Sequence, residues 1–439
     1  MFKKIIFLII MVMVSVNLQA QFNPIKFHKD SLDNGLKVIY CLDKSAPTVA
    51  TVLFYKVGSK NEISTQTGYA HFFEHLMFEA TENIPRSSID KYVQSAGGNL
   101  NASTSFDETV YYFELPSNQL NLALWIESQR MRKLKVDTIG VETQRGVVLE
   151  EMKERTTNQP YGTLLQKTME NLFKGTSYGW DVLGYDKNIA AATIDNFKQF
   201  YNKYYHPNNA VLVITGDFDI PETKKMVKEY FGIYPRGPEI LKDTIKFPPI
   251  TKPYRETFFD EKVQLPGLFV AYRGPARNDS DYYAMSLLTD ILASGESSRL
   301  YKRLVDKEQI AVEASAMPWS LQYTGILLLV GIAIPGKDIK ILEKIMLEEV
   351  NKVIKNGVTE EELQKSKNIT EAGYISDKKN NLEKAQALAE NEAYYGGAEL
   401  INTELERFMK VTSNDIKRVA NKYFGTDKNV TLIYMPKEK

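Results

Sequence analysis

The sequence predicts an α+β protein made of two homologous domains, each a largely antiparallel sheet with helices packed on one face. Three observations support this fold class: the length, an internal repeat, and the alternation of strand-like and helix-like segments. The chain has 439 residues, more than one hydrophobic core usually organises. Hydrophobic residues make up 43% and charged residues 25%, which are globular proportions and argue against disorder. Strands that alternate with long helices are typical of a sheet that helices cover.

The internal repeat relates residues 193–214 to residues 412–433, at a constant offset of 219 (412 − 193). Both segments have the pattern of an amphipathic helix, a turn and an apolar strand. A repeat with so long a period indicates duplicated domains rather than a solenoid. A chance match of two helix-turn-strand patterns is the alternative. The residues of the first copy that recur in the second are Thr193, Lys198, Asn202, Lys203, Tyr204, Val211 and Ile214.

The stretch between Pro235 and Pro253 is rich in proline, which predicts an extended linker between the two domains. We therefore expect a signal peptide over 1–20, an N-terminal domain over 22–235, a linker over 236–253 and a C-terminal domain over 254–439.

Within the N-terminal domain, the elements follow from local residue patterns. The tripeptide Asp33-Asn34-Gly35 predicts a tight hairpin turn before the first buried strand. Runs rich in β-branched and aromatic residues predict strands over 36–41, 49–56 and 109–115. Amphipathic segments predict helices over 68–80, 88–96, 120–134 and 142–156.

The first twenty residues have the pattern of a secretory signal: Lys3 and Lys4, an apolar run over 5–14, and a small residue at Ala20. An uncleaved N-terminal anchor is the alternative. The only cysteine, Cys41, excludes an internal disulfide and is expected to be a buried strand thiol. A secreted protein without disulfides fits the bacterial periplasm. Beyond this signal, no apolar stretch of the sequence is long enough to span a membrane.

The charge balance excludes one class of partner. The 55 basic residues equal the 55 acidic residues, so there is no electrostatic basis for general nucleic-acid binding.

The residues that point to chemistry lie in the segment His71-Phe72-Phe73-Glu74-His75. Residues four apart share one face of a helix, so both imidazoles can bind one metal ion. Neutral imidazole is a good zinc ligand. Glu74 is rotated off that axis and can act as a general base on a water molecule, the arrangement that metal-assisted peptide hydrolysis needs. A histidine pair without metal is the alternative, although burying these polar groups without a partner would cost several kcal/mol.

A third ligand must come from elsewhere in the chain, because catalytic zinc sites usually have three protein ligands. The best candidates are Glu150 and Glu151. On one helix these neighbours point about 100° apart, so normally only one of them can face the site. Helix geometry alone does not choose between them.

The segment 68–81, GYAHFFEHLMFEAT, resembles the inverted HxxEH zinc motif of the pitrilysin, insulin-degrading enzyme and mitochondrial processing peptidase family. The resemblance covers nearly the whole mature chain. The size of the chain resembles that of the half-length bacterial branch, in which two chains enclose a chamber. It implies zinc as the cofactor and Glu151 as the distal ligand. It also implies that Asn101 and Ala102 lie on an edge strand that pairs with the main chain of a peptide substrate. An ordinary strand role for these two residues is the alternative.

Two departures from the family pattern bear on the mechanism. Gln144 stands where the family often has a helper glutamate, and an amide cannot act as a base. Val305 and Val312 stand where self-sufficient members have an arginine and a tyrosine that polarise the substrate carbonyl. Valine cannot stabilise an oxyanion. We therefore expect the chain to be the zinc-bearing half of a heterodimer whose homologous partner supplies Arg and Tyr, unless Tyr301 or Arg303 replaces them in a homodimer.

The sequence thus predicts a secreted zinc metalloendopeptidase that hydrolyses peptides or unfolded polypeptides. Its predicted metal ligands are His71, His75 and Glu151, and its predicted base is Glu74. A non-catalytic scaffold or a peptide-binding subunit of the same fold is the alternative. The remaining histidines, His28 and His206, are expected at the surface.

Overall fold

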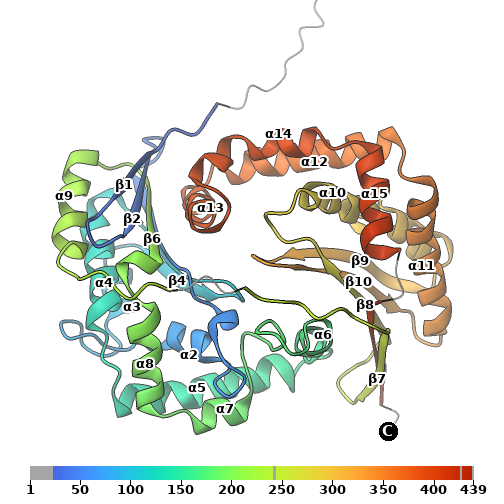
Figure 1. Cartoon of the computed structure of the whole chain (residues 1–439), viewed down its shortest axis with the longest axis horizontal. Helices are drawn as coiled ribbons and strands as arrows, with labels where there is room; N and C mark the ends of the chain where they lie inside the picture. Colours follow the sequence, from blue (N-terminus) through green and yellow to red (C-terminus); the bar gives the residue numbers. More distant parts are fainter. Residues whose placement is uncertain (1–22, 241–243, 426–427, 438–439) are drawn as a thin grey trace, which may run out of the picture.

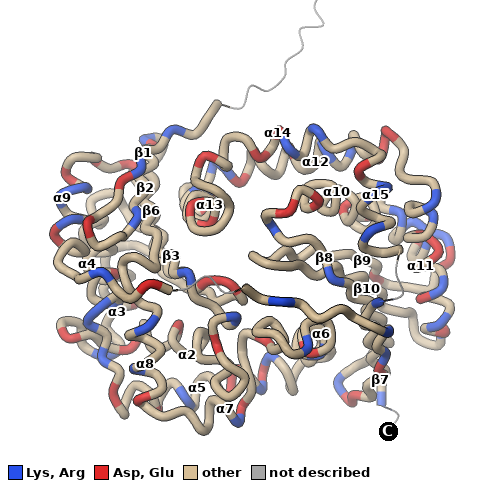
Figure 2. The backbone as a smooth tube through the Cα atoms, viewed as in Figure 1, with Lys and Arg blue, Asp and Glu red and all other residues tan. Residues whose placement is uncertain are grey.

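The computed structural model describes residues 23–240, 244–425 and 428–437, which form two halves, each built on one sheet (Figure 1). The predicted signal peptide over 1–20 lies outside the described residues. Among the described residues, none of the helices is both long and apolar enough to cross a membrane. Basic and acidic residues are interspersed over both halves (Figure 2).

The N-terminal half contains a six-stranded sheet in the order β1-β2-β6-β3-β5-β4. Only β2 and β6 pair in parallel; the other neighbours are antiparallel, as predicted. The predicted turn at Asn34-Gly35 joins β1 to β2, and Gly35 has the positive φ of 90° that favours glycine. The strands are β1 (His28–Ser31), β2 (Lys37–Leu42), β3 (Thr48–Tyr55), β4 (Asn99–Thr104), β5 (Thr109–Pro116) and β6 (Ala210–Gly216).

The helices of this half pack mainly against one face of the sheet. They are α2 (Tyr69–Leu76), α3 (Ile89–Ser95), α4 (Leu120–Lys133), α5 (Thr138–Thr156), α6 (Leu164–Leu172), α7 (Asp186–Ala191), α8 (Ile194–Tyr204) and α9 (Ile220–Phe231). The four predicted helices are present, but two have different ends. Helix α2 ends at Leu76, because the hydrogen bonds of the next turn span three residues instead of four. The bond from the Glu79 N–H to the Leu76 carbonyl is an example. Helix α5 begins at Thr138, because the Asp137 side chain caps it by accepting the Gly140 N–H.

The C-terminal half repeats this plan with a five-stranded sheet in the order β7-β11-β8-β10-β9. Its one parallel pair is β7 with β11. The strands are β7 (Tyr254–Asp260), β8 (Gly267–Gly274), β9 (Ala311–Ser320), β10 (Gly325–Ala333) and β11 (Val430–Pro436). The helices are α10 (Asp281–Ala293), α11 (Ile339–Asn356), α12 (Glu360–Asp377), α13 (Asn381–Tyr394), α14 (Glu404–Met409) and α15 (Ser413–Phe424).

The two repeat segments adopt the same structure at equivalent places. The first forms α8 and β6, and the second forms α15 and β11. Each helix starts with a capping box, built by Thr193 with Asn196 and by Thr412 with Asp415. Each following strand supplies the parallel pair of its sheet.

The second face of each sheet is covered by a helix that belongs to the other half (Figure 1). Helix α13 packs on β3 and β6, where Leu388 and Ala389 contact the cluster around Phe54 and Val213. Helix α6 packs on β8 and β11, where Met169 joins the cluster around Phe269. The sequence predicts helices on one face of each sheet. That prediction holds for the helices of the same half, but a helix of the other half covers the second face. Cys41 is buried under α13, as the sequence predicts for a strand thiol.

Candidate metal centre

The helix that carries the histidine pair is held at its start by Glu62. The buried Glu62 carboxylate accepts the N–H groups of Gly68 at 2.9 Å and Ala70 at 2.8 Å, and the indole N–H of Trp180 at 3.2 Å. Acceptor oxygens at this end satisfy N–H groups that have no partner within the helix. Burial raises the pKa of Glu62 to about 8, against the lowering effect of these hydrogen bonds. Sequence reasoning missed this residue.

Aromatic stacking fixes the rotation of α2 about its axis. Phe72 stacks on Phe197 with ring centroids 4.3 Å apart, and Phe73 stacks on Phe200 at 5.4 Å. Both phenylalanines of α2 are fully buried. This apolar side of α2 packs against α8, which leaves the polar side free to meet α5.

The structure brings His71, His75 and Glu151 together. One ligand atom of each residue lies within 4.8 Å of the others, and within the described part of the chain no second such set of three is found. The two Nε2 atoms are 3.4 Å apart. The Glu151 carboxylate lies 3.1 Å from the His75 Nε2 and 3.7 Å from the His71 Nε2. These spacings suit three donors around one small cation.

The geometry also separates the two candidate glutamates. The side chain of Glu151 is 19% exposed and faces the histidines, whereas that of Glu150 is 60% exposed and pairs with Lys153 at 3.1 Å. Arg155, one turn beyond, lies 2.7 Å from the Glu151 carboxylate and helps to orient it.

The electrostatics of His71 and Glu151 fit a divalent metal. Burial, and then the neighbouring His75, lower the pKa of His71 to about 4, so this imidazole is neutral at neutral pH. The hydrogen bond to His75 is the main cause that lowers the pKa of Glu151 to about 2, so this carboxylate is charged. Metal ligands must be deprotonated in this way. Two imidazole nitrogens that face each other with an anion beside them find a common partner in a cation.

Glu74 lies beside the ligands and is tied to the edge of the sheet. Its Oε2 accepts a 2.6 Å hydrogen bond from the hydroxyl of Thr104, the last residue of β4. Burial raises the pKa of Glu74, while the Thr104 hydrogen bond and the nearby His75 oppose that shift. A half-buried carboxylate with a raised pKa is a suitable general base. Sequence reasoning did not identify Thr104.

Strand β4 is the last strand of its sheet, so its outer edge has no neighbour among the described strands. Asn101 lies opposite Tyr112 and Ala102 opposite Tyr111 on β5. The Asn101 side chain is exposed, and its Oδ1 accepts the Ala102 N–H at 2.8 Å. Both residues are therefore on an edge strand whose end contacts Glu74.

Gln144 lies on the same helix as Glu151 but makes a different contact. Its side-chain amide donates to Glu79 at 2.7 Å. Glu79 also pairs with Arg86, which in turn binds Asp137 at the start of α5. Gln144 thus joins α5 to the segment that follows α2 and is a structural residue in this conformation.

Val305 and Val312 stand where the family resemblance leads us to expect arginine and tyrosine. Val305 packs against the core of the C-terminal half, and Val312 is 48% exposed at the start of β9. Arg303 pairs with Glu308 at 3.1 Å.

Of the remaining histidines, His28 is exposed on β1 as expected. The prediction that His206 lies at the surface is wrong. It is buried, with Nε2 2.5 Å from the Asn202 carbonyl oxygen, because Gly237 packs directly against its imidazole ring.

Comparisons with known proteins identify the family of the chain. Residues 37–185 match the family profile described as Insulinase (Peptidase family M16), and residues 191–370 match the one described as Peptidase M16 inactive domain. The chain is 29% identical to the zinc protease PqqE of Helicobacter pylori, over 98% of this chain and 97% of that protein.

Two solved structures share the fold. A protease from Helicobacter pylori superposes with a TM-score of 0.90 at 28% identity, covering 94% of this chain and all of that one. The periplasmic protease PqqL of Escherichia coli superposes with a TM-score of 0.77 at 20% identity, over 94% of this chain but only 48% of the longer PqqL chain. The profiles together reach into both halves, and the three predicted metal ligands lie within the residues matched by the insulinase profile. The chain belongs to peptidase family M16, the insulinase family, and to its half-length bacterial branch.

Proposed function

We propose that the protein is a zinc metalloendopeptidase that hydrolyses peptides or unfolded polypeptides. The convergence of His71, His75 and Glu151, with Glu74 beside them, is the single observation that carries this function. Three protein donors leave a position open, as catalytic zinc sites do and structural ones do not. The zinc protease name of the Helicobacter pylori relative supports the same chemistry.

Zinc, when bound, polarises a substrate carbonyl and lowers the pKa of water. The remaining work falls to side chains of this chain. Glu74 accepts the proton of the attacking water and can pass it to the leaving amine. The Thr104 hydroxyl orients the Glu74 carboxylate by its 2.6 Å hydrogen bond.

The free edge of β4 is the proposed substrate strand. Main-chain pairing there binds an extended peptide whatever its side chains, which suits unfolded polypeptides better than folded ones. Asn101 and Ala102 lie in the middle of this edge. Because the strand ends at Thr104, pairing would place the peptide main chain beside Glu74.

We further propose that the chain is the zinc-bearing subunit of a heterodimer and that it works in the periplasm or outside the cell. The apolar Val305 and Val312 leave the oxyanion without the expected arginine and tyrosine, which a homologous partner would supply. The location rests on the basic and apolar pattern of residues 1–20.

The description of residues 191–370 as an inactive domain favours a second candidate, a non-catalytic scaffold or peptide-binding subunit. The residues that match this description include none of the three predicted ligands. Zinc analysis of the pure chain, followed by turnover of a mixed peptide library, separates the candidates. An enzyme binds one zinc and cleaves when its partner is present. A scaffold or binding subunit does not cleave under any of these conditions.

A further inference from the structure

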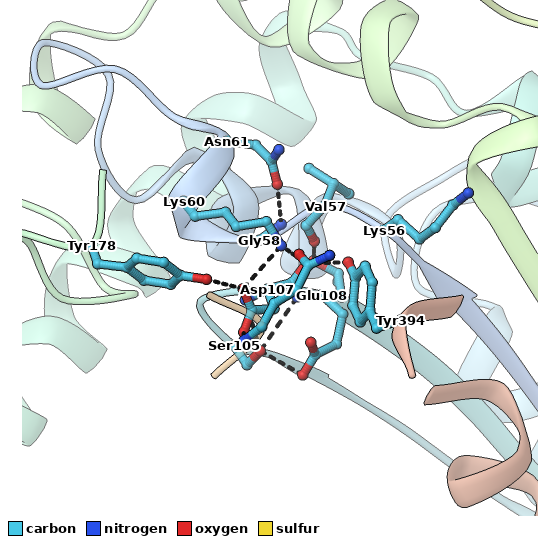
Figure 3. Close-up of polar contacts among 12 residues, drawn as sticks. Lys56, Val57, Gly58, Lys60, Asn61, Ser105, Asp107, Glu108, Tyr178 and Tyr394 are labelled. Atoms are coloured by element: carbon cyan, nitrogen blue, oxygen red, sulfur yellow. Dashed lines mark hydrogen bonds and ion pairs between the residues drawn. The ribbon is translucent and has the colours of Figure 1, made fainter. Parts of the chain in front are cut away.

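Asp107 lies in the turn between β4 and β5 and is surrounded by hydrogen-bond donors (Figure 3). The Lys60 ammonium group lies 2.9 Å from its Oδ1 and 3.0 Å from its main-chain oxygen. The Tyr178 hydroxyl donates to the same Oδ1. The side chains of Lys60 and Asp107 are only 5% and 4% exposed. Breaking a buried pair of this kind is strongly destabilising, because an unpaired charge remains.

Two further donors come from the C-terminal half of the protein. The main-chain N–H of Gln322, in the loop between β9 and β10, donates to the Asp107 Oδ2 at 2.8 Å. The hydroxyl of Tyr394, at the end of α13, donates to the Asp107 main-chain oxygen at 2.7 Å. One residue of the N-terminal half is thus held from both halves at once.

The turn that carries Asp107 is the continuation of the proposed substrate strand. Asp107 is three residues beyond Thr104, which holds Glu74. Between them, Ser105 is fixed on both sides: its carbonyl accepts the Ser59 N–H, and its hydroxyl accepts the Asp107 N–H at 3.1 Å. The turn has little freedom to move without displacing Thr104.

We infer that Asp107 is a positioning residue that couples the C-terminal half to strand β4 and, through Thr104, to the base Glu74. The effect of Asp107 on catalysis rests on the proposed function of Glu74. The anchoring of strand β4 by Asp107 does not depend on that function. The C-terminal half then has a role in the site that it performs without any metal ligand. It fixes the end of the strand along which the substrate lies.

Tyr394→Phe is the sharpest test, because it removes one hydroxyl that crosses between the halves. The ring keeps its edge contact with Phe54 at 5.6 Å and its position beside the Lys60 ammonium group. Asp107→Asn should have the larger effect, because the amide nitrogen cannot accept the hydrogen bonds that one carboxylate oxygen accepts. The matched control is Tyr374→Phe, which removes a 2.6 Å tyrosine-to-carbonyl bond that lies within the C-terminal half.

We expect zinc content to be unchanged in all three variants of the zinc-loaded protein with its partner. Tyr394→Phe should lower kcat by about two- to tenfold and Asp107→Asn by about ten- to a hundredfold, with smaller changes in KM. Hydrogen exchange of the β4 amides that bond to β5 should be faster in both variants. The control should match the wild type in kcat and in β4 exchange.

A merely structural role would lower the melting temperature but leave kcat at 25 °C and β4 exchange at their wild-type values. That result for both variants would overturn the inference, and so would faster β4 exchange with wild-type kcat. If the wild type with zinc and partner cleaves no peptide, the proposed function fails instead. The exchange measurement then decides alone whether Asp107 anchors β4.

Discussion

The hydroxyl of Thr104 lies 2.6 Å from the carboxylate of Glu74, and this hydrogen bond joins the edge strand β4 to the metal-centre helix α2. The strand and the helix pack against each other, although 22 residues separate them along the chain (99 − 77). This hydrogen bond links the place where a peptide would bind to the group that would activate water.

Glu74→Gln should keep zinc and lose most activity. The amide preserves the shape of the side chain but cannot accept a proton, and removing a general base typically costs about two to four orders of magnitude in rate. Zinc analysis and peptide turnover on the same sample test this expectation. Near-normal turnover by the zinc-loaded variant would reject Glu74 as the base.

Thr104→Val should lower kcat by a smaller factor, about three- to tenfold, because the carboxylate remains but loses one neutral hydrogen-bond donor. Thr104→Ser restores the hydroxyl and should recover most of the rate. If valine and serine variants behave alike, the hydrogen bond has no part in catalysis.

His71→Ala and Glu151→Gln should both lose most of the bound zinc, because each removes one of three converging donors. Glu150→Gln is the matched control on the same helix. Its carboxylate is exposed and paired with Lys153, so its zinc content should stay at the wild-type value. Full zinc occupancy in both ligand variants would show that the metal binds elsewhere.

The pure chain should be a slow peptidase, and a homologous chain with the Arg and Tyr pair should accelerate it. Losing one oxyanion donor typically costs about a hundred- to a thousandfold in kcat. The measurement is a titration of activity against the candidate partner at constant zinc. Full activity of the chain alone, lost in Tyr301→Phe or Arg303→Met, would instead support a homodimer that uses these residues.

The ion pair between Asp43 and Lys384 should make stability depend on pH in the acid range. Burial alone would raise the pKa of Asp43, but the hydrogen bonds from Lys384 and Ser45, together with the charge of Lys384, outweigh it and lower the pKa from 3.8 to about 2. Because the folded-state pKa is depressed, the contribution is present above pH 3.8 and is lost as the pH falls through about 2.

The Asp43→Asn variant should therefore be less stable at neutral pH by about 2 kcal/mol, with the difference from the wild type shrinking toward pH 2. Urea unfolding at several pH values measures it. Asp30→Asn is the control, since its pair with Lys224 is exposed and should contribute less than about 1 kcal/mol. An equal, pH-independent effect of both substitutions would contradict the expectation.

The parts of the fold that depend on neighbouring residues were predictable from the sequence. The spacing of His71 and His75 implies one helical face, and Asn34-Gly35 implies its hairpin turn. The ends of α2 and α5 were less predictable, because they depend on tightened bonds and on the Asp137 cap. From the sequence, Gln144 corresponds in position to a helper glutamate of the family. Only the fold shows that its side chain binds Glu79.

The contacts that link distant segments were outside the reach of sequence patterns. Helix geometry left Glu150 and Glu151 open, and only the resemblance chose Glu151. Nothing in the sequence pairs Thr104 with Glu74, Glu62 with the start of α2, or Asp107 with the Gln322 N–H. An amphipathic pattern reports that a helix has an apolar side, but it does not report which sheet that side covers. The crossed positions of α6 and α13 were missed for this reason.

The crossed helices have a consequence for biosynthesis. The N-terminal sheet receives its last strand at residue 216, but the helix that closes its second face begins only at residue 381, about 165 residues later (381 − 216). At typical ribosome speeds of about 5 to 20 residues per second, the nascent sheet waits for roughly ten seconds or more with an apolar surface open to water. The N-terminal half therefore cannot cover the second face of its sheet until α13 has been made, and we expect the nascent chain to bind a chaperone in this interval.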